Sequence, residues 1–202
     1  PGLLSLVKKY CGPGARVFDY GCGRGEFPNA LSNMGLAVVA YDQADEMIAE
    51  AKRGFPKLPL LSKREFSEQF PSLRSTFDLV TSNLVLCILE KEDQIKILSD
   101  IKTLLKPKGK VIMSFCHPKY DFRPESLMTK NIIPTDATYD SEFRYEKVIK
   151  ENGIRFHDYH RPLTYYDNLF KDNGFSVTDV LESEILDRDY PPDFIIFGLA
   201  VI

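Results

Sequence analysis

The sequence has no excess of basic residues. It carries 26 Lys and Arg against 29 Asp and Glu in 202 residues, a formal net charge of −3. Because nucleic-acid binding depends on many basic contacts to phosphate, this balance gives no electrostatic reason to expect a nucleic-acid partner. The Lys-rich run KPKGK at 106–110 stands at a turn signal and is interpreted as a solvated turn.

Cysteine pairs and long apolar runs are also missing. The four cysteines are widely spaced, with no C-x-x-C pair. This spacing argues against a zinc site or a disulfide scaffold and favours a reducing compartment, so we expect a cytoplasmic protein. No apolar run reaches about 18 residues, so no membrane partner is expected. The sequence opens on Pro1 without Met, so we expect the natural N-terminus to lie upstream, and targeting is left open.

The remaining composition, 44% hydrophobic and 27% charged, is that of one globular domain over residues 1–202. Short apolar runs that read as strands alternate with amphipathic segments that read as helices, up to residue 115. The predicted strands lie at 16–19, 36–42, 58–61, 77–82 and 110–115. This alternation predicts a doubly wound, mainly parallel α/β sheet of the Rossmann-like type, with helices on both faces.

The pattern changes after residue 116. Residues 117–163 form a predicted insertion, in which 142–150 and 154–161 flank the turn ENG and read as a β-hairpin. Thr164 is the predicted N-cap of a helix over 164–173. Segments 175–185 and 193–202 are predicted as an antiparallel pair joined by DRDYPP, which gives seven strands with the last two partly reversed.

A glycine loop at 17–27, VFDYGCGRGEF, follows the first strand. Its G-x-G-x-G spacing differs from the G-x-G-x-x-G of dinucleotide sites, and the carboxylates of Asp19 and Glu26 would repel a pyrophosphate. A cationic group would be favoured beside Asp19. Asp42 ends the second strand, where a carboxylate accepts ribose hydroxyls. A ribose with an ammonium or a sulfonium, and without pyrophosphate, describes S-adenosylmethionine.

Four ordered segments, 17–27, 40–48, 77–89 and 104–115, resemble successive motifs of the class I S-adenosylmethionine-dependent methyltransferases. The resemblance implies that the loop holds the methionine part of the cofactor, that Asp42 holds the ribose and that Gln43 lies beside the adenine. It places Asn83 and Leu84 near the reactive end. The family's adenine-binding acid after the third strand is missing, and Ser62 is the candidate there. The predicted cofactor-binding residues are Asp19, Tyr20, Gly21, Gly23, Gly25, Asp42, Gln43, Ser62, Asn83 and Leu84.

A finer resemblance involves the insertion. His117-Pro118 and the segment 159–163 resemble a small-molecule subgroup of this family, in which the insertion and its hairpin cover the substrate. The aromatic residues of the insertion are consistent with the wall of an apolar acceptor site and equally with a minor core.

Methyl transfer to a hydroxyl or a protonated amine needs a base, and a histidine suits that role near neutral pH. His117 leaves the carboxyl end of the fifth strand, where open α/β sheets bind ligands. His160 is the second candidate, with Asp158 on the same strand face as its orienting partner. His157 and His160 lie on opposite faces of the strand, so no metal site is expected.

The sequence therefore predicts an S-adenosylmethionine-dependent methyltransferase that acts on an oxygen or nitrogen of a small, partly apolar metabolite. A methyltransferase acting on protein or RNA is one alternative. A non-catalytic module that binds the cofactor within a larger assembly is the other. The sequence leaves the acceptor atom and the oligomeric state open.

Overall fold

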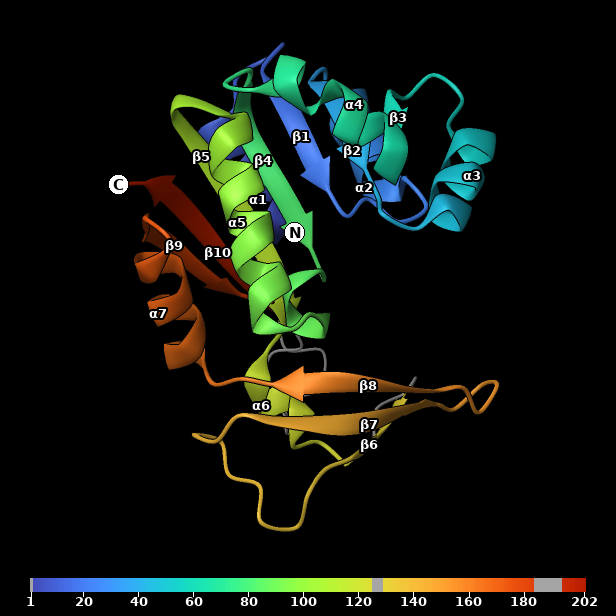
Figure 1. Ribbon diagram of the computed structural model, residues 1–202, viewed down its shortest axis with the longest axis vertical. Helices are drawn as coiled ribbons and strands as arrows, with labels where there is room; N and C mark the ends of the chain where they lie inside the picture. Colours follow the sequence, from blue (N-terminus) through green and yellow to red (C-terminus); the bar gives the residue numbers. More distant parts are fainter. Residues whose placement is uncertain (1, 125–128, 184–193) are drawn as a thin grey trace.

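A seven-stranded sheet forms the body of the protein in a computed structural model that describes residues 2–124, 129–183 and 194–202. The strand order is β3-β2-β1-β4-β5-β10-β9 (Figure 1). The strands are β1 Arg16–Tyr20, β2 Ala37–Tyr41, β3 Leu60–Leu61, β4 Phe77–Asn83, β5 Leu105–Cys116, β9 Phe175–Glu182 and β10 Phe194–Val201. β1 to β5 pair in parallel, and β10 runs antiparallel to both β5 and β9. The predicted α/β sheet with a reversed C-terminal strand is confirmed.

Helices cover both faces of this sheet. They are α1 Gly2–Tyr10, α2 Glu26–Asn33, α3 Asp45–Gly54, α4 Lys63–Leu73, α5 Lys91–Leu104 and α7 Leu163–Asp172. Val17 of β1 packs in a cluster with residues of α1 and α2, whereas its neighbour Phe18 packs in the larger cluster with residues of α4, α5 and α7. Successive side chains of a strand point to opposite faces, so Val17 and Phe18 are both apolar because both faces of β1 are covered.

Helix α4 was not predicted. Its sequence, KREFSEQFPSL, is mostly polar and contains Pro71. A complete capping box begins it: the Ser62 hydroxyl accepts from the Glu65 N–H, and the Glu65 carboxylate accepts from the Ser62 N–H at 2.8 Å. Phe66 anchors the helix to the core against Tyr41, with ring centroids 4.2 Å apart.

Other boundaries differ from the sequence prediction at element ends. β5 begins at Leu105, so KPKGK lies within its first half instead of preceding it. The N-cap of α7 is Pro162, and Thr164 lies inside the helix, so the predicted cap was wrong. Of the predicted C-terminal strand pair, 184–185, 193 and the connecting DRDYPP lie outside the described residues.

The insertion forms a second, three-stranded antiparallel sheet in the order β6-β7-β8. Its strands are β6 Thr129–Ile132, β7 Phe143–Ile149 and β8 Arg155–His160, and the short helix α6 Pro118–Asp121 precedes them. The predicted hairpin is confirmed as β7 and β8, whereas β6 and α6 were not predicted. Figure 1 shows this sheet beyond the carboxyl ends of β1 and β4.

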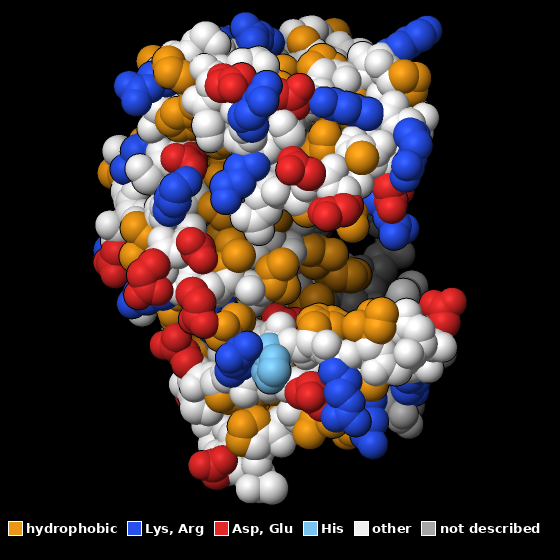
Figure 2. All heavy atoms as spheres, turned by 45° about the vertical axis from the view of Figure 1, so that its right-hand side comes forward, with side chains coloured by type: hydrophobic (Ala, Val, Ile, Leu, Met, Phe, Trp, Pro, Cys, Tyr) orange, Lys and Arg blue, Asp and Glu red, His pale blue; other side chains and the backbone are white. Residues whose placement is uncertain are grey.

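Two polar contacts join the end of the insertion to the residues that follow the 3₁₀ turn η1, Leu86–Ile88. The Arg161 guanidinium donates to the Leu89 carbonyl at 2.7 Å, and the Tyr159 hydroxyl donates to Glu90. Between the small sheet and the body, Figure 2 shows a hollow in which hydrophobic side chains gather. The insertion is therefore fastened to the segment that follows β4.

Candidate functional site

The glycine loop turns away from β1 on a set of backbone hydrogen bonds. The N–H groups of Gly21 and Cys22 both donate to the Tyr41 carbonyl, at 2.8 and 2.9 Å. Gly21 has φ +85°, and a Cβ on it would lie 2.3 Å from Cγ2 of Val85. A side chain cannot be accommodated there without a shift of Val85, which follows β4. The first glycine of the motif therefore allows the loop to pack against the segment after β4.

Asp42 closes the glycine loop from the end of β2. Its Oδ2 accepts from the Gly23 N–H at 2.8 Å, and its Oδ1 accepts from the Ala44 N–H at 2.9 Å. Two backbone amides thus fix the carboxylate, and each oxygen retains a lone pair for another donor. Gln43 follows on the surface. This geometry is compatible with the hydroxyl-binding role predicted for Asp42.

Asp19 lies buried at the end of β1, 2% exposed. Its Oδ1 accepts from the Thr81 hydroxyl at 2.6 Å, because β1 and β4 pair with Asp19 opposite Thr81. The pKa of Asp19 is raised to about 7: burial raises it most, the Thr81 hydrogen bond lowers it, and the nearby Asp42 carboxylate raises it. Thr81 was not singled out from the sequence, although a threonine within a buried strand was a signal.

The charged side chains at this edge of the sheet fit a cationic nucleoside. Asp19 and Asp42 are two carboxylates at the loop, and Arg24, the loop's own cation, is paired with Glu50 of α3 at 2.8 Å. A pyrophosphate would face uncompensated negative charge, whereas an ammonium or sulfonium would favour the ionised form of Asp19. The structure therefore supports the choice of ligand made from the loop spacing.

The side chains of Tyr20 and Ser62, two of the predicted cofactor contacts, have other partners within the protein. The Tyr20 ring is 5% exposed in the core, and its hydroxyl donates to Asp100 of α5 at 3.1 Å. Its side chain thus points into the sheet's covered face and not toward the loop, contrary to the predicted contact. Ser62 is the N-cap of α4. Its contact with adenine stays a prediction.

Asn83 and Leu84 line a cavity of about 560 Å³ at the carboxyl ends of β4 and β5. The start of α1 and the neighbouring ends of β9 and β10 form its other walls. Leu84 has φ +59°, a left-handed conformation that is rare for a non-glycine residue and typical of functional sites. The Ser114 hydroxyl donates to Asn83 Oδ1. The cavity lining is Gly2, Leu3, Ser5, Asn83, Leu84, Ser114, Leu181, Glu182, Ser183, Phe194 and Ile196.

His117 is fully buried behind this cavity. Its Nδ1 accepts from the Lys119 N–H at 3.1 Å and caps α6. Burial lowers the pKa of His117, so the neutral ring carries its proton on Nε2. Nε2 has no hydrogen-bond partner among the described residues, and Oε1 of Glu182 lies 3.5 Å away. In this tautomer His117 presents a donor and cannot accept a proton, which argues against the predicted role as a base.

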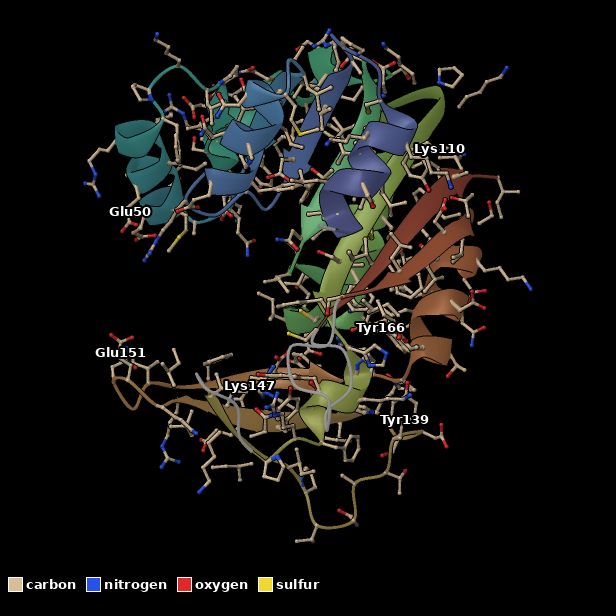
Figure 3. All side chains as sticks on the ribbon, turned by 180° about the vertical axis from the view of Figure 1, so that it is seen from behind. Glu50, Lys110, Tyr139, Lys147, Glu151 and Tyr166 are labelled. Atoms are coloured by element: carbon tan, nitrogen blue, oxygen red, sulfur yellow. The ribbon has the colours of Figure 1, made fainter. Side chains whose placement is uncertain are left out.

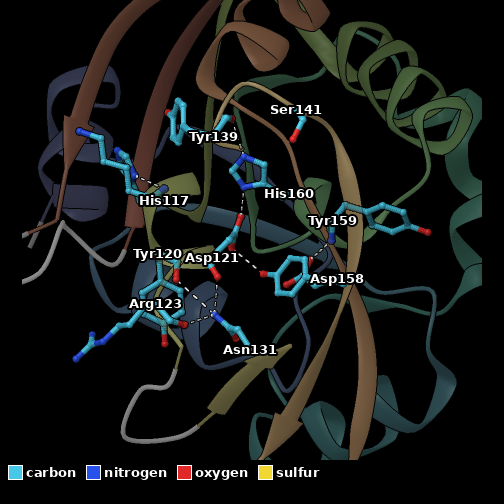
Figure 4. A network of polar contacts seen from close by, with 12 residues as sticks. His117, Tyr120, Asp121, Arg123, Asn131, Tyr139, Ser141, Asp158, Tyr159 and His160 are labelled. Carbon is cyan, nitrogen blue, oxygen red and sulfur yellow. Dashed lines mark hydrogen bonds and ion pairs between the residues drawn. The ribbon is translucent and has the colours of Figure 1, made fainter. Parts of the chain in front are cut away.

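His160 is also fully buried, and its partner is not the predicted one. Its Nδ1 lies 2.9 Å from Oδ2 of Asp121, and its Nε2 lies 2.8 Å from the Tyr139 carbonyl. The Tyr145 hydroxyl donates to the other oxygen of Asp121 at 2.7 Å (Figure 4). The predicted dyad of Asp158 and His160 was therefore wrong. Both ring nitrogens of His160 contact groups of the insertion, so in this conformation the residue has a structural role there.

Asp158 does share the buried strand face of His160, as predicted, but it pairs with Lys147 of β7. The two groups are 2.5 Å apart, and their side chains are 5% and 6% exposed. Burial lowers the pKa of Lys147, but Asp158, Cys116 and Asp121 together raise it above its ordinary value. Figure 3 shows Lys147 within the small sheet, away from the hairpin tip at Glu151. This ion pair across β7 and β8 was not foreseen.

His157 is exposed on the opposite face of β8. Over the ranges that the structure describes, no group of three or more His, Cys, Asp or Glu residues is placed to hold a metal ion. No helix in those ranges has the length and apolar character needed to cross a membrane.

Comparison with known proteins relates this geometry to a family. Residues 2–180 match the methyltransferase domain family. The ribosomal protein L11 methyltransferase of Thermotoga petrophila is 28% identical over 110 residues, 54% of this chain and 40% of that protein. The chain thus matches less than half the length of this curated relative.

Solved structures match over the whole chain. A putative S-adenosylmethionine-dependent methyltransferase from Listeria monocytogenes has a TM-score of 0.71 at 22% identity, covering 100% of this chain and 97% of that one. The glycopeptide N-methyltransferase MtfA with bound S-adenosylmethionine has a TM-score of 0.72 at 12% identity, covering 100% and 93%. The chain belongs to the methyltransferase domain family, with the fold that was predicted from its motifs.

Proposed function

We propose that this protein transfers a methyl group from S-adenosylmethionine to an oxygen or nitrogen of a small, partly apolar metabolite. The observation that carries the proposal is the cavity beside Asn83 and Leu84. Its volume, about 560 Å³, is that of a small-molecule site, and five of its lining side chains are apolar: Leu3, Leu84, Leu181, Phe194 and Ile196.

The cofactor supplies an activated methyl group, so this chain's residues bind, orient and exclude water. Asp19 would balance the positive charge, and Asp42 would hold the ribose. Asn83 and Leu84 line the cavity and, as the motif order implies, would lie beside the reactive end of the cofactor. The small sheet β6-β7-β8, fastened to the segment after β4, would cover the reacting groups.

A protein acceptor is the second candidate. It is favoured by the curated relatives that carry the name ribosomal protein L11 methyltransferase. Their matches cover 54% and 59% of this chain, however, whereas the structural matches span it almost entirely. The similarity to the L11 enzymes therefore does not extend over all of the residues that form the cavity and the small sheet.

The test is transfer of a tritiated methyl group from labelled cofactor to a cell extract that is afterwards split into small-molecule and macromolecular fractions. We expect label in the small-molecule fraction, and no label there with an Asp42→Ala control that lacks the ribose carboxylate. Label found only in macromolecules would replace the proposal with a protein or RNA acceptor. Label in neither fraction would favour a non-catalytic module.

A further inference from the structure

The described lining of the cavity beside Asn83 and Leu84 carries charge of one sign only. Among its described lining residues, Glu182 is the only charged side chain, and no Lys or Arg lines it. Glu182 ends β9, and its side chain is 56% exposed, so the carboxylate is accessible to a ligand. The apolar side chains beside it offer contact to the uncharged part of a ligand. The cavity therefore favours a ligand that is apolar with one cationic or donor group.

His117 gives this carboxylate a fixed position. Its buried Nε2–H has no hydrogen-bond partner in the described part of the chain, and the nearest acceptor is Oε1 of Glu182, at 3.5 Å. A buried donor without a partner costs free energy that a short movement of Glu182 recovers. Since Nδ1 is held by the Lys119 N–H, the ring cannot turn its proton elsewhere. His117 is thus a positioning residue that draws Glu182 to one side of the cavity.

We propose that the acceptor bound here is a small apolar amine, held as its ammonium form by Glu182, with its apolar body against Leu181 and Phe194. This inference rests on the proposed function and narrows its acceptor from an oxygen or nitrogen to a nitrogen. A carboxylate acceptor would meet the like charge of Glu182, and an uncharged alcohol would donate a hydrogen bond to the carboxylate without the attraction between two opposite charges. The ammonium can pass one proton to the Glu182 carboxylate that it contacts, which leaves a neutral nitrogen with the lone pair that accepts the methyl group.

The test uses three probes with the same apolar body: 2-phenylethylamine, 2-phenylethanol and phenylacetate. Each is titrated calorimetrically at pH 7 into protein saturated with S-adenosylhomocysteine. We expect the amine to bind at least about tenfold more tightly than the other two. Glu182→Gln should remove that preference and leave the affinity for 2-phenylethanol unchanged. The matched control is Glu151→Gln at the hairpin tip, which should keep the preference (Figure 3).

A second variant locates the probes. Phe194→Ala should weaken the amine and the alcohol alike, because it removes apolar wall and no charge. Equal binding of the three probes, an amine preference that survives Glu182→Gln, or no binding of the amine would each overturn the inference. Affinity for S-adenosylhomocysteine, measured in the same variants, should not change. If amine binding behaves as expected while label enters macromolecules alone, the proposed metabolite acceptor fails and the amine site stands.

Discussion

Asp19 connects cofactor binding to pH at the scale of one residue. Its pKa, raised by burial to about 7 from an ordinary value of 3.8, leaves the carboxyl protonated below neutral pH in the cofactor-free protein. A cationic ligand binds the ionised form, so we expect the affinity for S-adenosylmethionine to rise as pH increases from about 6 to about 8 and to level off above. Asp19→Asn should abolish the rise and lower the affinity at pH 8 by at least about tenfold. Calorimetry at several pH values measures both effects.

The same shift has a consequence for stability. Because the folded-state pKa of Asp19 is raised, this group favours the folded state at low pH, and its contribution is lost as pH rises between about 4 and 7. The free energy of unfolding of the cofactor-free Asp19→Asn variant should therefore depend less on pH across that window. An unchanged slope, measured by urea unfolding, would show that Asp19 titrates normally.

Gly21 tests the contact between the glycine loop and Val85. Gly21→Ala places a methyl group 2.3 Å from Cγ2 of Val85 at a left-handed φ, so we expect a loss of about 1–3 kcal/mol in the free energy of unfolding. Val85→Ala in the same chain should recover the steric part of that loss, and the φ cost should remain. Gly23→Ala is the control, because a Cβ there meets no described atom within 4 Å, although its φ is also positive. Strictly additive losses in the double variant would contradict the contact.

At the scale of elements, Arg161 holds the small sheet against the segment after β4. Its guanidinium donates to the Leu89 carbonyl and lies over the rings of Tyr159 and Tyr165, at 4.6 and 5.2 Å from their centroids. Arg161→Lys loses the planar stacking and the fixed donor geometry. We expect amide hydrogen exchange in β8 and η1 to become about tenfold faster. The control, Arg155→Lys at the exposed pair with Glu146, should leave exchange in η1 unchanged.

The main sheet could be predicted from the sequence because its strands are continuous apolar runs separated by clear glycine and proline signals. Helix α4 could not, since its apolar residues are few and Pro71 lies inside it. β6 could not be predicted either, because its sequence is mostly polar. Its Asn131 is nevertheless buried, and the side-chain amide donates to carbonyls of residues 121 and 123. Such contacts appear only when α6 and the residues that follow it are in place.

The site residues likewise divide into those that could be predicted from the sequence and those that could not. Asp42 and the glycines each belong to a short motif at the end of a strand, so their positions could be predicted from the sequence. The partner of His160 did not, because Asp121 stands 39 residues earlier and comes from α6. Strand parity put Asp158 on the correct face, but it could not show that Lys147 would take that carboxylate. Glu182 was not identified, because one acid near the end of a strand carries no pattern of its own.

At the scale of the whole molecule, the carboxylates of Asp19 and Asp42 predict which ligand stabilises the fold. S-adenosylhomocysteine at 100 times its dissociation constant should raise the free energy of unfolding by about 2.7 kcal/mol. For a chain of this size, that corresponds to a melting temperature roughly 5–10 °C higher. NAD at the same concentration should give no shift, because its pyrophosphate faces Asp19 and Asp42. A larger shift with NAD, measured by scanning calorimetry, would contradict the assignment of the loop.

The position of β10 also constrains how the protein is made. β10 lies between β5 and β9 and supplies Phe194 and Ile196 to the cavity. During synthesis, residues 194–201 leave the ribosome after every other strand of the main sheet. Until they insert, β9 has no hydrogen-bonded neighbour in that sheet, and the cavity lacks one wall. A nascent chain can therefore complete the glycine loop and the neighbouring parallel strands early, but it acquires the cavity only when β10 is in place.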